Sequence, residues 1–190
     1  MIYQPKLLLH VCCGPCAVGT HESLEKEGWH ISFLFYNPNI HPYDEYCRRQ
    51  ESFYKYMEES GQKGLVPYAY QPRDFFQLVN SRPDRCSECY RLRFQKVAEW
   101  GKKNGFQYFT STLSISPFQN IENIYLVGEQ IAREFDMIFL KRDFRPFYRK
   151  SRERSIEMNL YRQKYCGCIY SLWEGEKKRL WKSLFGQKPS

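Results

Sequence analysis

Eight cysteines in a chain of 190 residues are the side chains best able to carry out chemistry. Three of them directly follow an apolar run, in the sequence Cys12-Cys13-Gly14-Pro15-Cys16. The others are a C-x-x-C pair, a C-x-C pair and one isolated residue: Cys86 and Cys89, Cys166 and Cys168, and Cys47. Thiolates bind zinc and iron–sulfur clusters, and paired thiols carry redox chemistry. The cysteines therefore predict a metal or redox site.

The sequence lacks the features of a secreted or membrane protein. Residues 1–6 have neither the basic nor the apolar region of a signal peptide, and no stretch approaches the roughly 20 apolar residues of a membrane span. We therefore expect a cytoplasmic protein without a membrane partner, in which the thiols stay reduced. In that compartment, clustered cysteines bind metal or carry out redox chemistry more often than they form structural bridges.

Spacing alone leaves three interpretations of the thiols open. The sequence Cys13-Gly14-Pro15-Cys16 has the C-x-x-C pattern of a thioredoxin-type dithiol, which would make the chain a thiol–disulfide oxidoreductase. Two zinc knuckles, Cys13/Cys16 and Cys86/Cys89, would lie much farther apart than the ~15–20 residues usual between knuckles. Thiolates from separate loops can also hold a 4Fe-4S cluster, and the spacing favours this interpretation over the other two.

The C-x-C pair at Cys166 and Cys168 predicts a redox function of its own. With only Gly167 between them, the two thiols can converge on one metal or close a small, strained disulfide ring. Strained disulfides are easily reduced, so such a pair is suited to turnover. Cys47 lies in an amphipathic segment without a nearby partner, and we expect it in the core.

The elements that must position these thiols alternate in type along the chain. Strand-length apolar runs occur at 7–11, 31–36, 65–70, 107–111 and 137–141, and helix-length segments at 17–27, 43–60, 87–104 and 121–135. This alternation predicts an α/β fold with an open parallel sheet between helices, a three-layer, Rossmann-like sandwich. Ligands bind at the carboxyl ends of the strands in such folds, and Cys12 follows the first strand.

Positive charge is concentrated towards the C-terminus. Residues 1–140 carry 15 Lys and Arg against 16 Asp and Glu, whereas residues 141–190 carry 14 against 5. We interpret residues 1–190 as a single domain, with an α/β core at 1–140 and a basic part at 141–190 that completes the active site. Aromatic residues interleave the basic run, which predicts RNA binding by Arg145, Arg149 and Lys150. On charge alone, a solvated basic surface without a partner remains the alternative.

ATP hydrolysis is not the expected chemistry. Neither G-x-G-x-x-G nor G-x-x-x-x-G-K-[ST] occurs in the chain. Cysteines occupy the turn in which the related ATP pyrophosphatases that act on tRNA carry a Ser-Gly-Gly-x-Asp-Ser loop.

Six motifs follow one another along most of the chain. They are Cys12-Cys13-Gly14-Pro15-Cys16; Tyr36-Asn37-Pro38-Asn39-Ile40-His41-Pro42 with Glu45-Tyr46 and Arg49; Cys86-x-x-Cys89-Tyr90 with Arg93; Thr112-Leu113 with Ser116-Pro117-Phe118-Gln119; Asp143-Phe144-Arg145-Pro146; and Tyr161-Arg162-Gln163-Lys164-Tyr165-Cys166-Gly167-Cys168. Together they resemble the cobalamin-independent epoxyqueuosine reductases of the QueH type. The resemblance implies reduction of the epoxide of epoxyqueuosine, at the wobble position of tRNA, to the alkene of queuosine. It also implies a fold similar to the adenine-nucleotide hydrolase sandwiches.

The same resemblance implies roles for individual residues. Cys12, Cys13, Cys86 and Cys89 are the expected ligands of a 4Fe-4S cluster, and Cys166 and Cys168 the expected redox-active pair. Cys16 is expected to lie beside the cluster or to bind an additional iron. The candidates for substrate contact or proton donation are Tyr36, Asn37, His41, Tyr46 and Tyr90.

The implied partners are tRNA carrying epoxyqueuosine and an external electron donor. Arg145, Arg149 and Lys150 become the expected tRNA-binding residues. Glu45 and Arg49, at i and i+4, are as typical of a helix surface as of a functional site. A zinc-stabilised RNA-binding module without catalysis and a thiol–disulfide oxidoreductase are the alternative functions.

Overall fold

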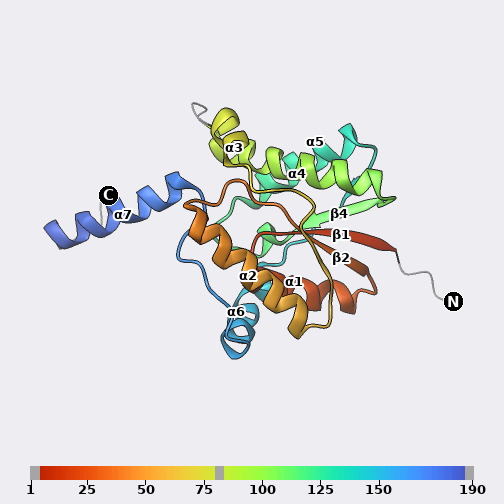
Figure 1. Cartoon of the computed structure of the whole chain (residues 1–190), viewed down its shortest axis with the longest axis horizontal. Coiled ribbons are helices and arrows are strands. Elements are labelled where there is room, and N and C mark those ends of the chain that lie inside the picture. Colours follow the sequence, from red (N-terminus) through yellow and green to blue (C-terminus); the bar gives the residue numbers. More distant parts are fainter. Residues whose placement is uncertain (1–4, 80–83, 187–190) are drawn as a thin grey trace.

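A computed structural model describes residues 5–79 and 84–186 and has the predicted three layers (Figure 1). Five parallel strands form the central sheet in the order β3-β2-β1-β4-β5. They are β1 (Lys6–Val11), β2 (His30–Phe35), β3 (Gly64–Leu65), β4 (Tyr108–Ser111) and β5 (Ile138–Phe139). The predicted fold class is therefore confirmed. The edge strands are shorter than the runs at 65–70 and 137–141, and Pro67, two residues after β3, lacks the N–H that would extend the ladder.

Helices cover both faces of the sheet. On one side lie α1 (Gly14–Lys26), α2 (Tyr43–Glu59) and α6 (Tyr148–Glu157), and on the other α3 (Pro72–Val79), α4 (Arg85–Lys103) and α5 (Ile121–Glu134) (Figure 1). Leu7 and Leu9 of β1 pack into the core under α1 and α2, and Leu8 packs into the core under α4 and α5. Burial on both faces explains why these strands are continuous apolar runs.

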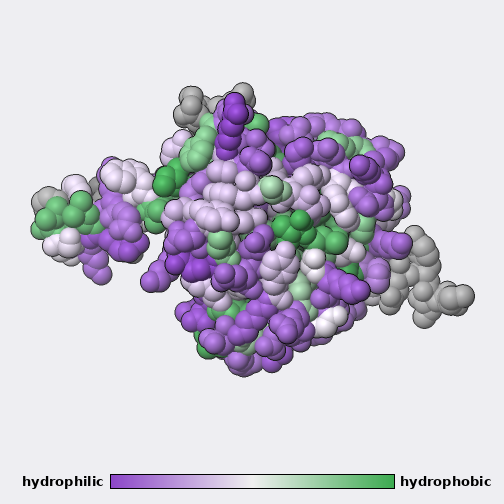
Figure 2. Space-filling view, viewed as in Figure 1, coloured by the Kyte–Doolittle hydropathy of each residue, from purple (hydrophilic) through white to green (hydrophobic). Residues whose placement is uncertain are grey.

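The described C-terminal part of the chain departs from this layered body. The single turn η1 (Thr112–Ile115) follows β4, and the single turn η2 (Arg145–Phe147) precedes α6. Helix α7 (Ile169–Phe185) projects away from the body (Figure 1). Figure 2 shows hydrophobic side chains at the far end of α7, where Leu180 and Leu184 are exposed. None of the helices that the structure describes combines the length and the apolar composition that crossing a bilayer requires.

The order of the strands places a crevice next to β1. The chain runs outward from β1 through β2 to β3 and then returns to β4, which pairs with the other side of β1. At such a reversal the neighbouring connections leave to opposite faces and open a crevice at the carboxyl ends of the strands. Cys12 and Cys13 follow β1 and Thr112 follows β4, so both turns border this crevice.

Gly14 allows α1 to begin close to α2. A Cβ atom at Gly14 would lie 2.3 Å from the carbonyl oxygen of Ser52. We predict that Gly14→Ala lowers the free energy of unfolding by about 1–3 kcal/mol through overpacking, as measured by denaturant unfolding. Gly175→Ala in α7 is the control, because a Cβ there meets none of the described atoms within 4 Å and alanine favours the helix. Equal destabilisation by both changes would contradict the prediction.

Candidate metal and redox site

Three thiols meet where α1 begins. The Sγ atoms of Cys12, Cys13 and Cys16 all lie within 4.8 Å of one another, and those of Cys12 and Cys13 are 3.8 Å apart. Within residues 5–79 and 84–186, no other three His, Cys, Asp or Glu side chains come equally close together. The structure thus groups Cys16 with two of the predicted cluster ligands.

Cys12 is the thiol of this group that ionises most easily. Hydrogen bonds from the thiols of Cys13 and Cys16, with one of 3.2 Å from the Thr112 hydroxyl, hold the pKa of Cys12 well below its usual value despite burial. Burial raises the pKa of Cys13, and hydrogen bonding to Cys12 raises the pKa of Cys16. A metal would bind these residues as thiolates, so its binding would displace the thiol protons.

A second group of thiols surrounds a small neighbouring cavity. Its lining includes four cysteines and three other polar residues: Cys86, Cys89, Tyr90, Arg93, Gln119, Cys166 and Cys168. Cys166 and Gln119 also line a cavity of about 350 Å³ that contains Cys12 and Cys16. Cys166 therefore lies on the boundary between the two groups. The four predicted cluster ligands are divided between these groups, two in each.

The disulfide expected between Cys166 and Cys168 is not formed, since both are free thiols. Each thiol contacts a different partner. Cys166 Sγ accepts a 3.2 Å hydrogen bond from Gln119 Nε2, whereas Cys168 Sγ caps α7 by accepting one of 3.4 Å from the Ser171 N–H. Gly167 between them has a φ of +133°, which only glycine adopts readily. Burial raises the pKa of the Cys166 thiol. The redox role of the pair remains a prediction.

Arg93 is a buried cation between the two groups of thiols. It is 1% exposed, its Nε donates to the Cys89 carbonyl, and its Nη2 finds no hydrogen-bond partner among the described residues. Burial opposes its charge, but the negative charges of Cys89, Cys166 and Cys12 contribute to raising its pKa. A buried donor without a partner carries a desolvation cost, so Arg93 is suited to contact an anionic group held by these thiols.

A buried ion pair holds the segment that carries Cys166. Arg49 and Glu45 of α2 are 1% and 2% exposed, and Arg49 Nε lies 2.8 Å from Glu45 Oε1. The two terminal nitrogens of Arg49 donate to the carbonyls of Cys166 and Tyr165 at 2.9 and 3.0 Å, and the Tyr161 hydroxyl donates to Glu45. The interpretation of Glu45 and Arg49 as a helix-surface pair is therefore wrong.

Two of the predicted substrate or proton-donor residues reach the segment with the C-x-C pair. The Tyr90 hydroxyl donates a 2.6 Å hydrogen bond to Gln119 Oε1, and Gln119 in turn donates to Cys166. The His41 N–H donates to the Gly167 carbonyl at 2.8 Å. Burial lowers the pKa of His41 to about 4, so this imidazole is neutral at pH 7.

The other three candidates make contacts within the core. Tyr36 packs against the ring of Tyr68, and Tyr46 packs against Phe35. Burial raises the pKa of both Tyr36 and Tyr46, which makes them weaker proton donors. Asn37 Nδ2 donates to the Val11 carbonyl at 2.9 Å and so fixes the turn after β2. These contacts are structural, and a role in substrate binding remains a prediction for all three.

The predicted RNA-binding cations are paired with carboxylates. Arg145 lies 2.6 Å from Asp143, Arg149 lies 3.0 Å from Glu153, and Lys150 lies 2.9 Å from Glu22. Their predicted role in tRNA binding has no direct support from these contacts and remains a prediction.

Sequence reasoning assigned no role to several residues that contact the thiols. Thr112 donates to Cys12, Gln119 to Cys166, and Gln163 Nε2 lies 3.7 Å from Cys16 Sγ. All three, with Arg93, stand inside the motifs that carry the family resemblance. The signal that could have identified these residues is that they are polar and stand next to a predicted strand or a thiol.

Comparison with known proteins agrees with this arrangement. Residues 7–174 match the sequence model of one family, described as epoxyqueuosine reductase QueH. The chain belongs to the QueH family. Proteins named epoxyqueuosine reductase QueH are 36% identical over 171 residues in Dehalococcoides mccartyi and 31% identical over 182 residues in Thermotoga maritima. These alignments span 90% of this chain, with 94% and 93% of the respective QueH relatives. The resemblance stated from the six motifs is confirmed.

A solved structure shares the fold of this QueH chain. It is the U34-tRNA thiolase NcsA from Methanococcus maripaludis, solved with its [4Fe-4S] cluster. The TM-score is 0.54, and the match covers 95% of this chain and 67% of NcsA at 14% sequence identity. At that identity the likeness concerns the fold, and it confirms the predicted type of α/β sandwich.

Proposed function

We propose that this chain is the oxidoreductase that reduces the epoxide of epoxyqueuosine to the alkene of queuosine at the wobble position of tRNA. Family membership supports the reaction, and one observation in the structure carries the proposal. Cys166 borders both the cavity with Cys12 and Cys16 and the cavity with Cys86 and Cys89. A substrate in the first cavity would therefore contact a thiol that also adjoins the second group.

The thiols of the two groups fit an iron–sulfur cofactor. We propose that Cys12, Cys13, Cys86 and Cys89 hold a 4Fe-4S cluster, with Cys16 beside it or bound to an additional iron. The unpartnered Nη2 of Arg93 supports this fit, because thiolates and inorganic sulfide give such a cluster a negative charge. When bound, the cluster would supply single electrons.

The reaction requires two electrons and two protons. Converting an epoxide to an alkene removes the oxygen as water, so two C–O bonds break. Oxidation of the Cys166 and Cys168 thiols to a disulfide releases two electrons and two protons, and this balances the reaction. An external electron donor must then reduce the disulfide for the next turnover.

Neighbouring side chains prepare the C-x-C pair for this step. Gln119 donates to Cys166 Sγ and accepts from the Tyr90 hydroxyl, so its amide links Tyr90 to the reacting thiol and fixes the orientation of both. Arg49 fixes the backbone at Cys166 by donating to its carbonyl. His41 holds Gly167 through its backbone N–H.

Cluster binding is tested by replacing single cysteines. We predict that Cys89→Ala protein, purified without oxygen, loses most of its iron, acid-labile sulfide and visible absorption. Cys47→Ala is the matched control and should keep all three, because Cys47 packs against the core on the α1 and α2 side. Full cluster occupancy in the Cys89→Ala protein would contradict the ligand assignment.

The reaction itself is tested with tRNA that carries epoxyqueuosine. Under anaerobic conditions with a chemical reductant, mass spectrometry of the nucleosides should show loss of one oxygen atom from the modified base. Zinc in place of iron, with no conversion, would favour an RNA-binding module. Reduction of protein disulfides without conversion would favour a thiol–disulfide oxidoreductase. We propose the cytoplasm as the place of action, because thiols stay reduced there.

A further inference from the structure

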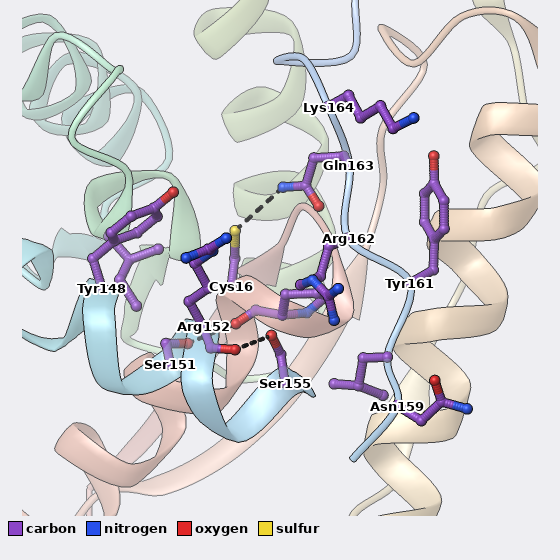
Figure 3. Close-up of a pocket in the computed structure, with 13 residues that line it drawn as sticks. Cys16, Tyr148, Ser151, Arg152, Ser155, Asn159, Tyr161, Arg162, Gln163 and Lys164 are labelled. Atoms are coloured by element: carbon purple, nitrogen blue, oxygen red, sulfur yellow. Dashed lines mark hydrogen bonds between the residues drawn. The ribbon is translucent and has the colours of Figure 1, made fainter. Parts of the chain in front are cut away.

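A third cavity, here called the α6 cavity, opens beside the thiols at the start of α1, and the reaction proposed above does not use it. Its volume is about 520 Å³, which is in the range of small-molecule sites, about 300–1,000 Å³. It lies between α6, the first turn of α1 and residues 159–164 (Figure 3). Cys16, Tyr148, Gln163 and Lys164 line both this cavity and the thiol cavity, so the two adjoin.

Three cations line the α6 cavity, and none of them has a carboxylate partner among the described residues. Arg152 comes from α6, whereas Arg162 and Lys164 come from the facing segment (Figure 3). Among the described residues, none of the three forms an ion pair. An anion could therefore bind here without first displacing a carboxylate. This distinguishes the three from Arg145 and its paired neighbours, whose charges are already partly neutralised.

The same cavity offers groups suited to a base or a ribose. Tyr148 contributes an aromatic ring, and nucleobases stack on such rings in complexes with single-stranded RNA. Gln163 Oε1 is buried and accepts no hydrogen bond from the described residues. It therefore provides an acceptor for an N–H or hydroxyl donor of a ligand. Positive charge, an aromatic ring and a free acceptor together match the chemistry of a nucleotide.

We infer that this cavity binds one nucleotide of the substrate RNA, adjacent to the nucleoside that is reduced. Its phosphate contacts Arg152, Arg162 and Lys164, and its base or ribose packs against Tyr148. The inference rests on the proposed function, because the reacting nucleoside occupies the adjoining cavity at Cys16 and Cys166. The bound nucleotide thereby fixes the position of the reacting nucleoside relative to the thiols.

Two triple variants with equal changes in charge test this site. Fluorescence anisotropy measures binding of a labelled anticodon stem–loop RNA to Arg152→Gln/Arg162→Gln/Lys164→Gln protein. We expect affinity to fall roughly 10- to 100-fold and the salt dependence to become shallower, as for the loss of phosphate contacts. The control is Lys96→Gln/Lys102→Gln/Lys141→Gln, which also removes three positive charges and should change affinity less than 3-fold, because these lysines lie outside the cavity and each is already paired with a carboxylate.

Comparing the two variants distinguishes a specific nucleotide site from general electrostatic attraction of RNA to a positively charged surface. Equal loss of affinity in both triple variants, or unchanged affinity in the first, would overturn the inference. Thermal unfolding of each variant shows whether the fold is kept, which we expect because all six side chains are at the surface. Tyr148→Ala, which keeps the charge, should weaken binding if the base or ribose contacts that ring.

Failure of the proposed reaction would be distinguishable from failure of this site. The binding measurement uses unmodified RNA and no reductant, so it does not depend on turnover. If the unaltered protein binds RNA through Arg152, Arg162 and Lys164 but converts no epoxyqueuosine, the site stands and the reaction is wrong. If conversion occurs while the first triple variant binds normally, the reaction stands and the site is wrong.

Discussion

Protein carrying Cys166→Ser and Cys168→Ser should bind iron and RNA like the unaltered chain and yet lose epoxyqueuosine reduction. We expect the rate to fall by about 10³-fold or more, a loss typical of residues that act as one catalytic unit. The reason is that serine cannot form a disulfide and so cannot deliver two electrons together. Iron binding should persist because neither residue belongs to the proposed ligand set.

The single variants sharpen this test. If the two thiols act as a pair, Cys166→Ser and Cys168→Ser should each lose about as much activity as the double variant, because one thiol alone cannot complete the disulfide. Cys47→Ser is the control and should retain activity. Repeated turnover by the double variant would exclude the dithiol step. Loss of iron from it would instead make Cys166 or Cys168 a metal ligand.

Arg49→Met should destabilise the protein by about 3–5 kcal/mol in denaturant unfolding. Removing one partner of a buried ion pair leaves the other charge poorly compensated, and here Glu45, 2% exposed, would keep only the Tyr161 hydroxyl and the 3.4 Å contact with Arg48. Methionine is of similar length but donates no hydrogen bond to Tyr165 or Cys166. We therefore also expect alkylation of the Cys166 thiol to become faster, as its segment is released from α2.

Arg48→Met provides a matched control. Arg48 is the preceding residue and also contacts Glu45, at 3.4 Å, but its side chain is 48% exposed. Exposed ion pairs contribute up to about 1 kcal/mol, so this variant should unfold nearly like the unaltered protein. Stabilities of Arg48→Met and Arg49→Met within 1 kcal/mol of each other would show that burial of Arg49 has no special importance.

The sheet was predictable because of where its strands lie. A strand such as β1 is buried on both faces by helices, which leaves an uninterrupted apolar run in the sequence. The position of Cys12 followed from the rule that ligand sites form at the carboxyl ends of such strands. The short helices α3 and α6 and the longer helix α7 were missed. In α6, only Ser151 and Ser155 are buried, so its sequence has no apolar stripe.

The site was only partly predictable, because its decisive contacts join distant parts of the chain. Arg49 and Cys166 are 117 residues apart, and the spacing of Arg49 from Glu45 is the same on an exposed helix as in this buried pair. The grouping of Cys16 with Cys12 and Cys13 agrees with their closeness in sequence. Spacing could not show, however, that Cys166 borders both groups of thiols, because residues 161–166 dock on α2 through Arg49. Of the ion pairs of Arg145, Arg149 and Lys150, only that of Lys150 joins distant parts of the chain, because its partner Glu22 lies in α1.

Residues 161–166, which cover the cavity lined by Cys12 and Cys16, are the last part of its lining to be synthesised. Gln163, which contacts Cys16, follows it by 147 residues. A ribosome adding about 5–20 residues per second needs roughly 7–30 s for that distance. Throughout this time the first three cysteines are present while one side of their cavity is still missing. Metal delivery therefore has a period of easy access that ends when residues 161–166 dock on α2, and oxidants have the same period in which to reach the unprotected thiols.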